Sequence, residues 1–385
     1  MYFSCEPLSL KQELIDVLRA FDAESAAFGD EKYVFLDEVS SIDGWEQAIK
    51  FFVETGLGKG KRLVATGSNA LLLKRGRDLL PGREIELRPF LPLSFREFLL
   101  HFGSADLVTA LKQSVIEKGS QMDKMHVSDV TKAILPFIPE IDGHLAAYLK
   151  TGGFLKPINE FLEIGSIAES TYEIYVRWVI GDVLKHGLRE LTFRSIVRGV
   201  LKDYSTRYAV HALAKEMEIP SHTTATSYLD FLEGILLLDN LYQVDPTARV
   251  AVPRKEKKTY FTDPFLYSAF SGYVMGKYQD FSTGKEALLV EGVVCDALKR
   301  WLGAYFSSSS RLWFFAGKKE TDFAMATGDG ALTGIEVKWQ STVTAKDFAN
   351  AGLFKHRIVL SKHDIDLSGE TMVLPAAVFL AMLAC

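Results

Sequence analysis

The sequence predicts an α/β protein with a parallel sheet at its front, a helical middle and a small mixed sheet at its end. Three observations lead to this fold class. Short apolar runs of strand type alternate with helical spacing over residues 1–100. A helix, a turn, a capped helix and a strand follow one another between residues 191 and 252, and several strand-type runs follow residue 258. Strands that alternate with helices in this way form parallel sheets covered on both faces.

Size and composition exclude several classes of protein. The 385 residues are 48% hydrophobic and carry a formal net charge of −5, which argues against a chain that coats nucleic acid along its whole length. At about 100–200 residues per domain, the length predicts two to three folded units. Cys5, Cys295 and Cys385 are too scattered for a disulfide framework or a zinc cluster, and they indicate a reducing compartment. The longest apolar run, 372–385, is too short for a bilayer span of about 20 residues. We therefore expect a cytoplasmic protein with no membrane partner.

The first hundred residues are expected to alternate helices with strands. The predicted elements are a helix over 8–21, a strand over 33–36, a helix over 45–53 and strands over 62–68 and 85–87. A further helix begins after Ser94, because Ser94 and Glu97 have the spacing of a capping box.

The rest of the chain changes character twice. Residues 98–184 have a mainly helical pattern, and the following segment has the element order of a winged helix-turn-helix. That segment is predicted to contain helices over 208–217 and 221–233, the second capped by Ser221, and a strand over 236–242. The last part is predicted to contain a helix over 286–302 and strands over 312–315, 321–325, 332–339, 357–361 and 372–375.

Two adjacent carboxylates, Asp37 and Glu38, end the apolar run 33–36. At the carboxyl end of a parallel strand such a pair faces the crevice where α/β proteins bind ligands, and there the first acid can hold Mg²⁺ while the second orients a water. This is the Walker B pattern. A strand that simply ends at a solvated, charged loop explains the same residues equally well.

The next strand favours the first interpretation. It ends in Thr66-Gly67-Ser68, and Ser68 stands where ATPases of the AAA-plus type place a sensor for the attacking water or the γ-phosphate. Further along, Arg83 offers a guanidinium that can contact the same phosphate.

In this order and spacing the motifs resemble prokaryotic AAA-plus-like ATPases that carry a C-terminal winged helix and a nuclease-like region. The resemblance is carried by Phe35-Leu36-Asp37-Glu38, Trp45, Thr66-Gly67-Ser68, Gly82-Arg83, residues 92–98, residues 260–264, Glu291 and Glu336-Val337-Lys338. It implies ATP and Mg²⁺ as cofactors, with Asp37 on the metal, Glu38 catalytic, and Ser68 and Arg83 at the nucleotide.

One family motif is missing from the sequence. Members begin with a strand and a GxxxxGK[ST] loop whose backbone N–H groups and lysine hold phosphates. The nearest match here, Gly56 to Arg62, has one residue too few between its glycines and follows Asp37 instead of preceding it. The chain is therefore expected to begin one element late, to bind ATP very weakly, and to have the missing loop encoded upstream if the start is late.

The C-terminal part carries a second candidate site. Glu336 and Lys338 share one face of a strand, and a hairpin centred near Asp329 sets Asp322 opposite Glu336. This pattern resembles the PD-(D/E)XK nuclease core, with Glu291 as its additional acid. The resemblance implies Mg²⁺ on Asp322 and Glu336, and a water positioned by Lys338. The alternative is a solvated cross-strand salt bridge worth about 0.2–1 kcal/mol.

The winged-helix segment offers candidate contacts to nucleic acid. Its second helix is expected to expose His222, Thr223, Thr224, Thr226 and Ser227. Basic residues before it (Arg194, Arg198, Lys202, Arg207) and after it (Arg254-Lys255, Lys257-Lys258) can neutralise a phosphate backbone. A helical module that packs on the ATPase part or on another subunit is an equally good interpretation.

These predictions combine into a domain assignment. Residues 1–100 form a P-loop NTPase-like, AAA-plus core without its phosphate loop, 101–190 a helical lid or linker, 191–257 a winged helix, and 258–385 a nuclease-like domain. The expected function is nucleotide-dependent action on DNA, with a homo-oligomer left open. The rival is a non-catalytic DNA- or protein-binding regulatory module in which neither site turns over.

Overall fold

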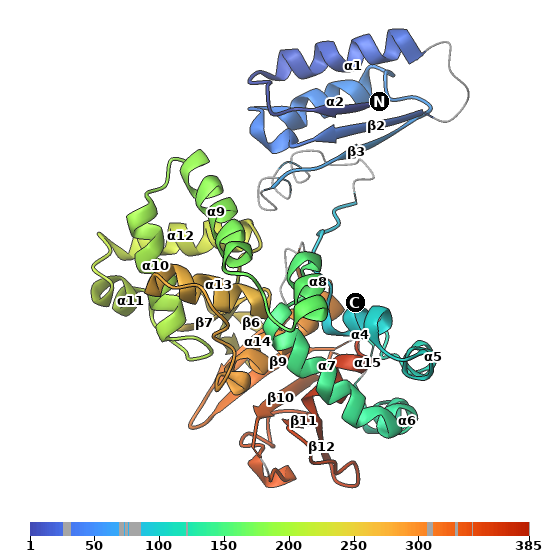
Figure 1. Cartoon of the computed structure of the whole chain (residues 1–385), viewed down its shortest axis with the longest axis vertical. Helices are drawn as coiled ribbons and strands as arrows, with labels where there is room; N and C mark the ends of the chain where they lie inside the picture. The colour runs from blue at the N-terminus through green and yellow to red at the C-terminus, as the bar shows by residue number, and fades with distance from the viewer. Residues whose placement is uncertain are drawn as a thin grey trace. The chain divides into compact units, whose positions relative to one another are not determined.

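The computed structural model describes residues 1–25, 32–68, 73, 76, 86–120, 122–305, 311–327, 330–340 and 342–384. The chain forms two compact units (Figure 1). The main part of the first is Met1–Pro89, and the second is made of Phe90–Glu233 and Leu237–Cys385. Each unit is described by itself.

The first unit is built on a parallel sheet of three strands among its described residues. The strands lie in the order β1 (Tyr2–Ser4), β2 (Lys32–Asp37) and β3 (Lys61–Ala65). The parallel sheet predicted for this region is thus confirmed. The strand expected over 85–87 is not formed by Glu86 and Leu87, and Ile85 lies outside the described residues.

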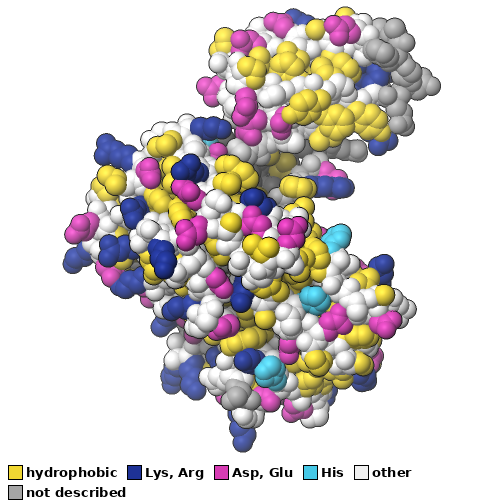
Figure 2. Space-filling view, viewed as in Figure 1, with side chains coloured by type: hydrophobic (Ala, Val, Ile, Leu, Met, Phe, Trp, Pro, Cys, Tyr) yellow, Lys and Arg dark blue, Asp and Glu magenta, His cyan; other side chains and the backbone are white. Residues whose placement is uncertain are grey.

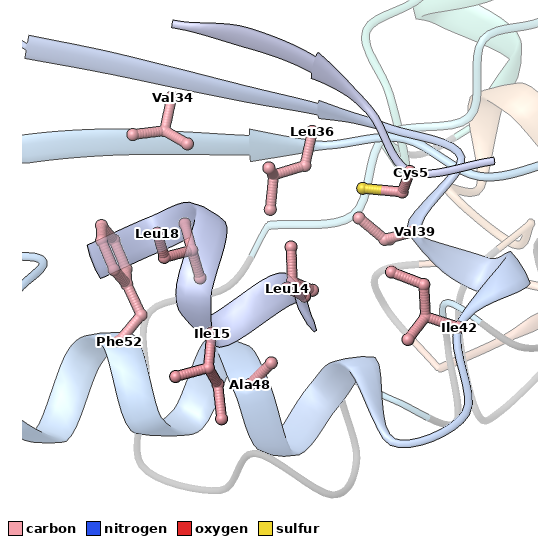
Figure 3. Packing of buried hydrophobic residues seen from close by; sticks show 10 residues of the cluster. All are labelled: Cys5, Leu14, Ile15, Leu18, Val34, Leu36, Val39, Ile42, Ala48 and Phe52. Atoms are coloured by element: carbon pink, nitrogen blue, oxygen red, sulfur yellow. The ribbon is translucent and has the colours of Figure 1, made fainter. Parts of the chain in front are cut away.

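Two helices, α1 (Lys11–Ser25) and α2 (Trp45–Glu54), supply the apolar face that packs against this sheet (Figure 3). The core comprises Cys5, Leu14, Ile15, Leu18, Val34, Leu36, Val39, Ile42, Ala48 and Phe52. Strand residues alternate between the two faces of a sheet, so the neighbours of Val34 and Leu36 point the other way. Tyr33 and Phe35 are accordingly 38% and 42% exposed.

The second unit is largely helical. Its helices are α4 (Phe95–Phe102), α5 (Ala105–Gln113), α6 (Lys124–Ile134), α7 (Ile138–Thr151), α8 (Leu155–Ile164), α9 (Glu169–Lys185), α10 (Glu190–Lys202), α11 (Val210–Glu216), α12 (His222–Gly234), α13 (Pro264–Met275), α14 (Glu286–Trp301) and α15 (Ala376–Met382). Among the described residues, none of these combines the length and the apolar character that a membrane span requires.

A mixed sheet of five strands, in the order β12-β11-β10-β9-β8, completes the second unit. Strands β10, β11 and β12 run parallel, whereas β9 is antiparallel to both β8 and β10. Two antiparallel pairs, β4 with β7 and β5 with β6, lie outside this sheet. The strands are β4 (Leu238–Tyr242), β5 (Val244–Asp245), β6 (Val250–Ala251), β7 (Lys257–Phe261), β8 (Leu312–Ala316), β9 (Glu320–Ala326), β10 (Leu332–Lys338), β11 (His356–Ser361) and β12 (Thr371–Pro375).

The C-terminal helix α15 joins the helical and sheet parts of the second unit. All of its residues are buried, and it packs against α4, α6 and α7 as well as β11, β12 and α14. The segments predicted as a lid, a winged helix and a nuclease-like domain therefore lie within one compact unit.

Helix α4 begins as its sequence predicts. The Ser94 hydroxyl accepts a hydrogen bond from the Glu97 N–H, and the Glu97 carboxylate accepts one from the Ser94 N–H. The first turn of this helix also contains Arg96. Its buried guanidinium donates to the carbonyls of Leu111, Ser114 and Ala381. These bonds hold the end of α5 and the C-terminal helix against α4.

Candidate functional sites

The first site lies at the carboxyl ends of β2 and β3. Parallel pairing brings Asp37, the last residue of β2, beside Thr66, which directly follows β3. The Thr66 hydroxyl donates to Asp37 Oδ1 at 2.5 Å, and the Tyr2 hydroxyl donates to Oδ2 at 2.8 Å. These hydrogen bonds lower the pKa of Asp37, because each of them stabilises the ionised carboxylate.

The neighbouring Glu38 has an unusual backbone. It adopts a left-handed conformation with φ of 56° and ψ of 46°, which costs a residue other than glycine about 1–3 kcal/mol. Contacts from two neighbouring segments hold it there. The Ser68 N–H donates to both carboxylate oxygens at 3.1 Å, and the hydroxyls of Ser68 and Ser40 donate to Oε1 at 2.9 and 2.7 Å.

The structure therefore brings three of the four predicted nucleotide-site residues together, namely Asp37, Glu38 and Ser68. Arg83 lies outside the described residues. The sequence interpretation missed Tyr2 and Ser40, which both donate to these carboxylates. Tyr2 lies on β1, which pairs with β2, so the expected position of β1 beside the strand that ends in Asp37 was the signal that could have identified it.

The second site lies where β9 meets β10. The antiparallel register pairs Ile335 with Phe323, and the next residues in each direction are Glu336 and Asp322, as the predicted hairpin requires. The Val337 N–H donates to Asp322 Oδ2 at 2.9 Å, and Lys338 Nζ donates to Glu336 Oε2 at 3.1 Å. Glu336 is only 1% exposed, so the alternative of a solvated salt bridge is wrong.

A residue that the sequence interpretation assigned elsewhere occupies the middle of this site. Lys258, on β7, was expected to be a surface lysine that neutralises phosphates, together with Lys257. Both are buried instead. Lys258 Nζ lies 2.8 Å from Glu291 Oε1, 2.7 Å from Glu320 Oε1 and 3.1 Å from Asp322 Oδ1.

Strand periodicity could have shown that Glu320 and Tyr260 also face this site. Glu320 precedes Asp322 by two residues on β9, and Lys258 precedes Tyr260 by two on β7, so each pair shares a face. The Tyr260 hydroxyl donates to Glu291 Oε1 at 2.7 Å. The association of β7 with β9 and α14, by contrast, has no signal in a local pattern.

Lys258 and the carboxyl groups of Glu291, Glu320, Asp322 and Glu336 form a carboxylate cluster. Burial has the largest effect on the pKa values of Glu291 and Glu336 in it. Burial and the charge of Asp322 raise the pKa of Glu291 to about 7, and the same two causes raise that of Glu336 to about 7. For Lys258, burial opposes the charge, yet the carboxylates of Glu291, Asp322 and Glu320 together raise its pKa. The ammonium of Lys258 is therefore charged at neutral pH.

This arrangement does not fit a divalent metal ion. Within the ranges that the structure describes, no group of three or more histidine, cysteine, aspartate or glutamate side chains is placed to hold one. The physical reason is Lys258, whose positive charge already lies among the carboxylates that the sequence assigns to Mg²⁺, Asp322 in particular.

The third candidate site is the surface of α10, α11 and α12. Ser221 caps α12, its hydroxyl accepting from the Thr224 N–H at 3.0 Å, as predicted. His222, Thr223 and Ser227 are exposed, whereas Thr224 and Thr226 are partly buried. Lys and Arg side chains gather over these helices (Figure 2), and α10 exposes Arg194, Arg198 and Lys202 at successive turns.

Three of the basic residues before α12 are already engaged within the chain, among them Arg207, which lies 3.5 Å from Glu256 and 3.6 Å from Glu320. Arg194 donates to the carbonyl of Val274 at 3.0 Å, and Lys202 forms an ion pair with Glu216. Tyr208, between α10 and α11, pairs with Lys257 of β7, so the three helices are tied to the β4–β7 strand pair.

Comparison with known proteins gives two matches to family models. Residues 1–99 match the AAA domain, and residues 142–275, from within α7 to the end of α13, match a domain of unknown function. No curated protein and no solved structure matches the chain. The first unit thus contains an AAA-like domain of the ATPase type, which agrees with its parallel sheet and with the carboxylates at the end of β2.

Proposed function

We propose that this chain is an AAA-like protein that binds a magnesium nucleotide weakly, since its sequence has no GxxxxGK[ST] loop, and that its second unit binds DNA. The proposed nucleotide binding rests on the hydrogen bonds at the sheet edge, where the hydroxyls of Thr66 and Ser68 donate to the carboxylates of Asp37 and Glu38. A strained Glu38 backbone supports a functional role, because such conformations persist where a site requires them.

The residues at this edge suit a magnesium nucleotide. Mg²⁺ is usually bound by one or two carboxylates together with phosphate oxygens and water, and bound ATP supplies the phosphoryl group for hydrolysis. Asp37 would hold the ion, since its lowered pKa keeps it ionised. Glu38 would orient a water, and Ser68, which donates to it, would report the state of the phosphate.

Calorimetric titration with Mg²⁺·ATP tests the nucleotide part. We expect Asp37→Asn to weaken the affinity about ten-fold, because the substitution removes a charged ligand worth roughly 1.4 kcal/mol. Asp43→Asn, which removes an exposed carboxylate of the same unit, serves as the matched control. Equal affinities in the two variants would show that Asp37 does not contact the magnesium nucleotide.

The DNA part rests on the order and the surface of α10, α11 and α12. Three helices followed by an antiparallel strand pair is the arrangement of a winged helix, and an exposed, hydroxyl-rich helix start suits contacts to phosphates and base edges. Arg198, on the exposed face of α10, adds positive charge to the same helical segment.

Fluorescence anisotropy with duplex DNA at several salt concentrations tests this part. We expect Arg198→Glu and Thr223→Asp each to lower the affinity about ten-fold at low salt and to flatten its salt dependence. Lys112→Glu, the same charge change at the exposed surface of α5, is the control. Equal effects of Arg198→Glu and Lys112→Glu would indicate nonspecific attraction and exclude this surface.

For the last sheet we propose a PD-(D/E)XK-like fold that binds nucleic acid without cutting it. The mixed sheet and the grouping of Asp322, Glu336, Lys338 and Glu291 support the likeness, and the position of Lys258 favours the non-catalytic alternative. An assay with Mg²⁺ or Mn²⁺ on varied DNA substrates decides between them. Cleavage that Asp322→Ala and Glu336→Ala abolish would establish a nuclease, whereas cleavage that survives both would reveal a contaminant.

A further inference from the structure

We propose that the ammonium of Lys258 is the permanent cation of the carboxylates Glu291, Glu320 and Asp322 in the second unit, and that it takes the role that the sequence assigns to a divalent metal ion at Asp322. This role of Lys258 depends on neither nucleotide nor DNA binding, so it stands or falls by itself.

Lys258 Nζ has a complete set of charged partners. An ammonium group has three protons to donate. Three carboxylate oxygens, from α14 and from two positions of β9, lie at 2.8, 2.7 and 3.1 Å from Nζ and belong to Glu291, Glu320 and Asp322. Each proton thus has its own carboxyl oxygen as acceptor, and the lysine needs neither water nor another ligand.

The ammonium is also unable to move aside. The Lys258 side chain is 1% exposed, and its backbone lies in β7, where it pairs with Leu241 of β4. A surface lysine leaves an ion site at little cost, since water solvates its charge. A buried one must take its charge through a region without water, which is strongly unfavourable.

Other donors of the chain also bond to oxygens of Asp322, Glu291 and Glu336. Asp322 Oδ2 accepts from the Val337 N–H, Glu291 Oε1 also accepts from Tyr260, and Glu336 Oε2 accepts from Lys338. A divalent ion that bound these oxygens would have to displace their donors, and at Asp322 it would lie close to the positive charge of Lys258. The chain therefore supplies internally the charge that a metal ion supplies in a metal-dependent site.

Thermal unfolding with and without Mn²⁺ tests the proposal. In Lys258→Met the carboxylates lose their cation, so we expect a lower Tm that about 1 mM Mn²⁺ raises again, by about 5–10 °C if the ion is in hundred-fold excess over its Kd. Lys299→Met is the matched control, because Lys299 is another lysine that pairs with carboxylates in the interior of this unit, at 2.5 Å from Asp239 and 3.5 Å from Glu233. It should lose stability without recovery in Mn²⁺.

A second measurement on the unaltered protein keeps the test decisive if Lys258→Met does not fold. Titration of Mn²⁺, followed by the electron paramagnetic resonance of the free ion, should give the same result for the wild type and for Asp322→Asn. A wild-type site that Asp322→Asn removes would overturn the proposal. So would a folded Lys258→Met protein that Mn²⁺ fails to stabilise.

Discussion

Gly152 is a residue whose side chain is excluded by its surroundings. Its φ of +57° and ψ of −157° lie in a region that only glycine adopts readily, and a Cβ there would lie 1.7 Å from Asp263 Oδ1. Asp263 is buried, and its carboxylate accepts from the N–H groups of Gly153 and Phe265 at 2.7 and 2.8 Å. The glycine and the carboxylate thus fix the junction after α7.

We expect Gly152→Ala to lower the free energy of unfolding by at least about 2–3 kcal/mol, from backbone strain and from the displaced Asp263. Gly143→Ala is the control, since Gly143 is exposed within α7 and a Cβ added to it would meet nothing within 4 Å. That change should stabilise the helix by about 0.5–1 kcal/mol. Urea denaturation measures both, and similar values for the two variants would refute the steric argument.

The buried carboxyls give the second unit a pH dependence. Glu291 has a pKa of about 7 in the folded protein, raised from the ordinary value of 4.5 by burial and by Asp322. The folded state therefore binds its proton more tightly than the unfolded state. The resulting stabilisation is complete below about pH 4.5 and is lost as the pH rises through about 7.

Between pH 5 and 7 the free energy of unfolding should fall as the pH rises, and it should fall less steeply in Glu291→Gln than in the wild type. We expect the two slopes to differ by up to about 1.4 kcal/mol per pH unit. Glu286→Gln, in the first turn of the same helix, should leave the wild-type slope in place. Denaturation curves at several pH values measure the slopes. A Glu291→Gln slope equal to that of the wild type would contradict the raised pKa.

At the scale of elements, α4 is stabilised both by a local capping box and by hydrogen bonds to residues that are distant in the sequence. The capping box was predictable, because Ser94 and Glu97 lie within one turn. Arg96 was not, because its acceptors come from the end of α5 and from α15, nearly three hundred residues away in the case of Ala381. Its burial therefore depends on tertiary contacts that no periodicity records.

We expect Arg96→Met to cost about 3 kcal/mol or more, since it leaves several buried carbonyls without a donor at about 1–3 kcal/mol each. Ser94→Ala in the same helix removes one cap bond and should cost about 1 kcal/mol. Thermal denaturation of the two variants compares these losses. If Arg96→Met costs no more than Ser94→Ala, then the guanidinium does not hold α5 and α15 in place.

The same distinction explains which parts of the carboxylate cluster were predictable. Asp322, Glu336 and Lys338 follow from strand alternation and from one hairpin, both of which are local. Lys258 comes from a strand that is paired with β4 and separated from β9 by two helices and β8. A basic pair in the sequence suggests a solvated surface, and burial beside carboxylates reverses that interpretation.

At the scale of the whole molecule, the two units have separate hydrophobic cores. Residues 86–90, which precede α4, lie outside any helix or strand, and the side chain of Phe90 is fully exposed at 101%. Exposed segments of this kind are preferred sites of proteolysis.

We expect limited digestion with chymotrypsin to cut after Phe90 and to release a fragment that begins at Leu91 and remains folded. Phe90→Ala should remove that fragment from the early products. Mass spectrometry and N-terminal sequencing identify the cut. Early cleavage within α7 or β10 instead would show that the second unit is less stable than the segment before it.

The buried helix α15 has a consequence for how the protein is made. Helices α4, α6 and α7 are synthesised early, yet the surface on which they pack includes α15, which the ribosome adds long after them. The buried core of the first unit comes from residues 5–52, and its third strand ends at Ala65, so this unit can fold long before α15 is made. During synthesis of the second unit, the surfaces of α4, α6 and α7 that contact α15 therefore stay unpaired until α15 has been made. A message cut short just before α15 would therefore yield a folded first unit attached to an incomplete second one.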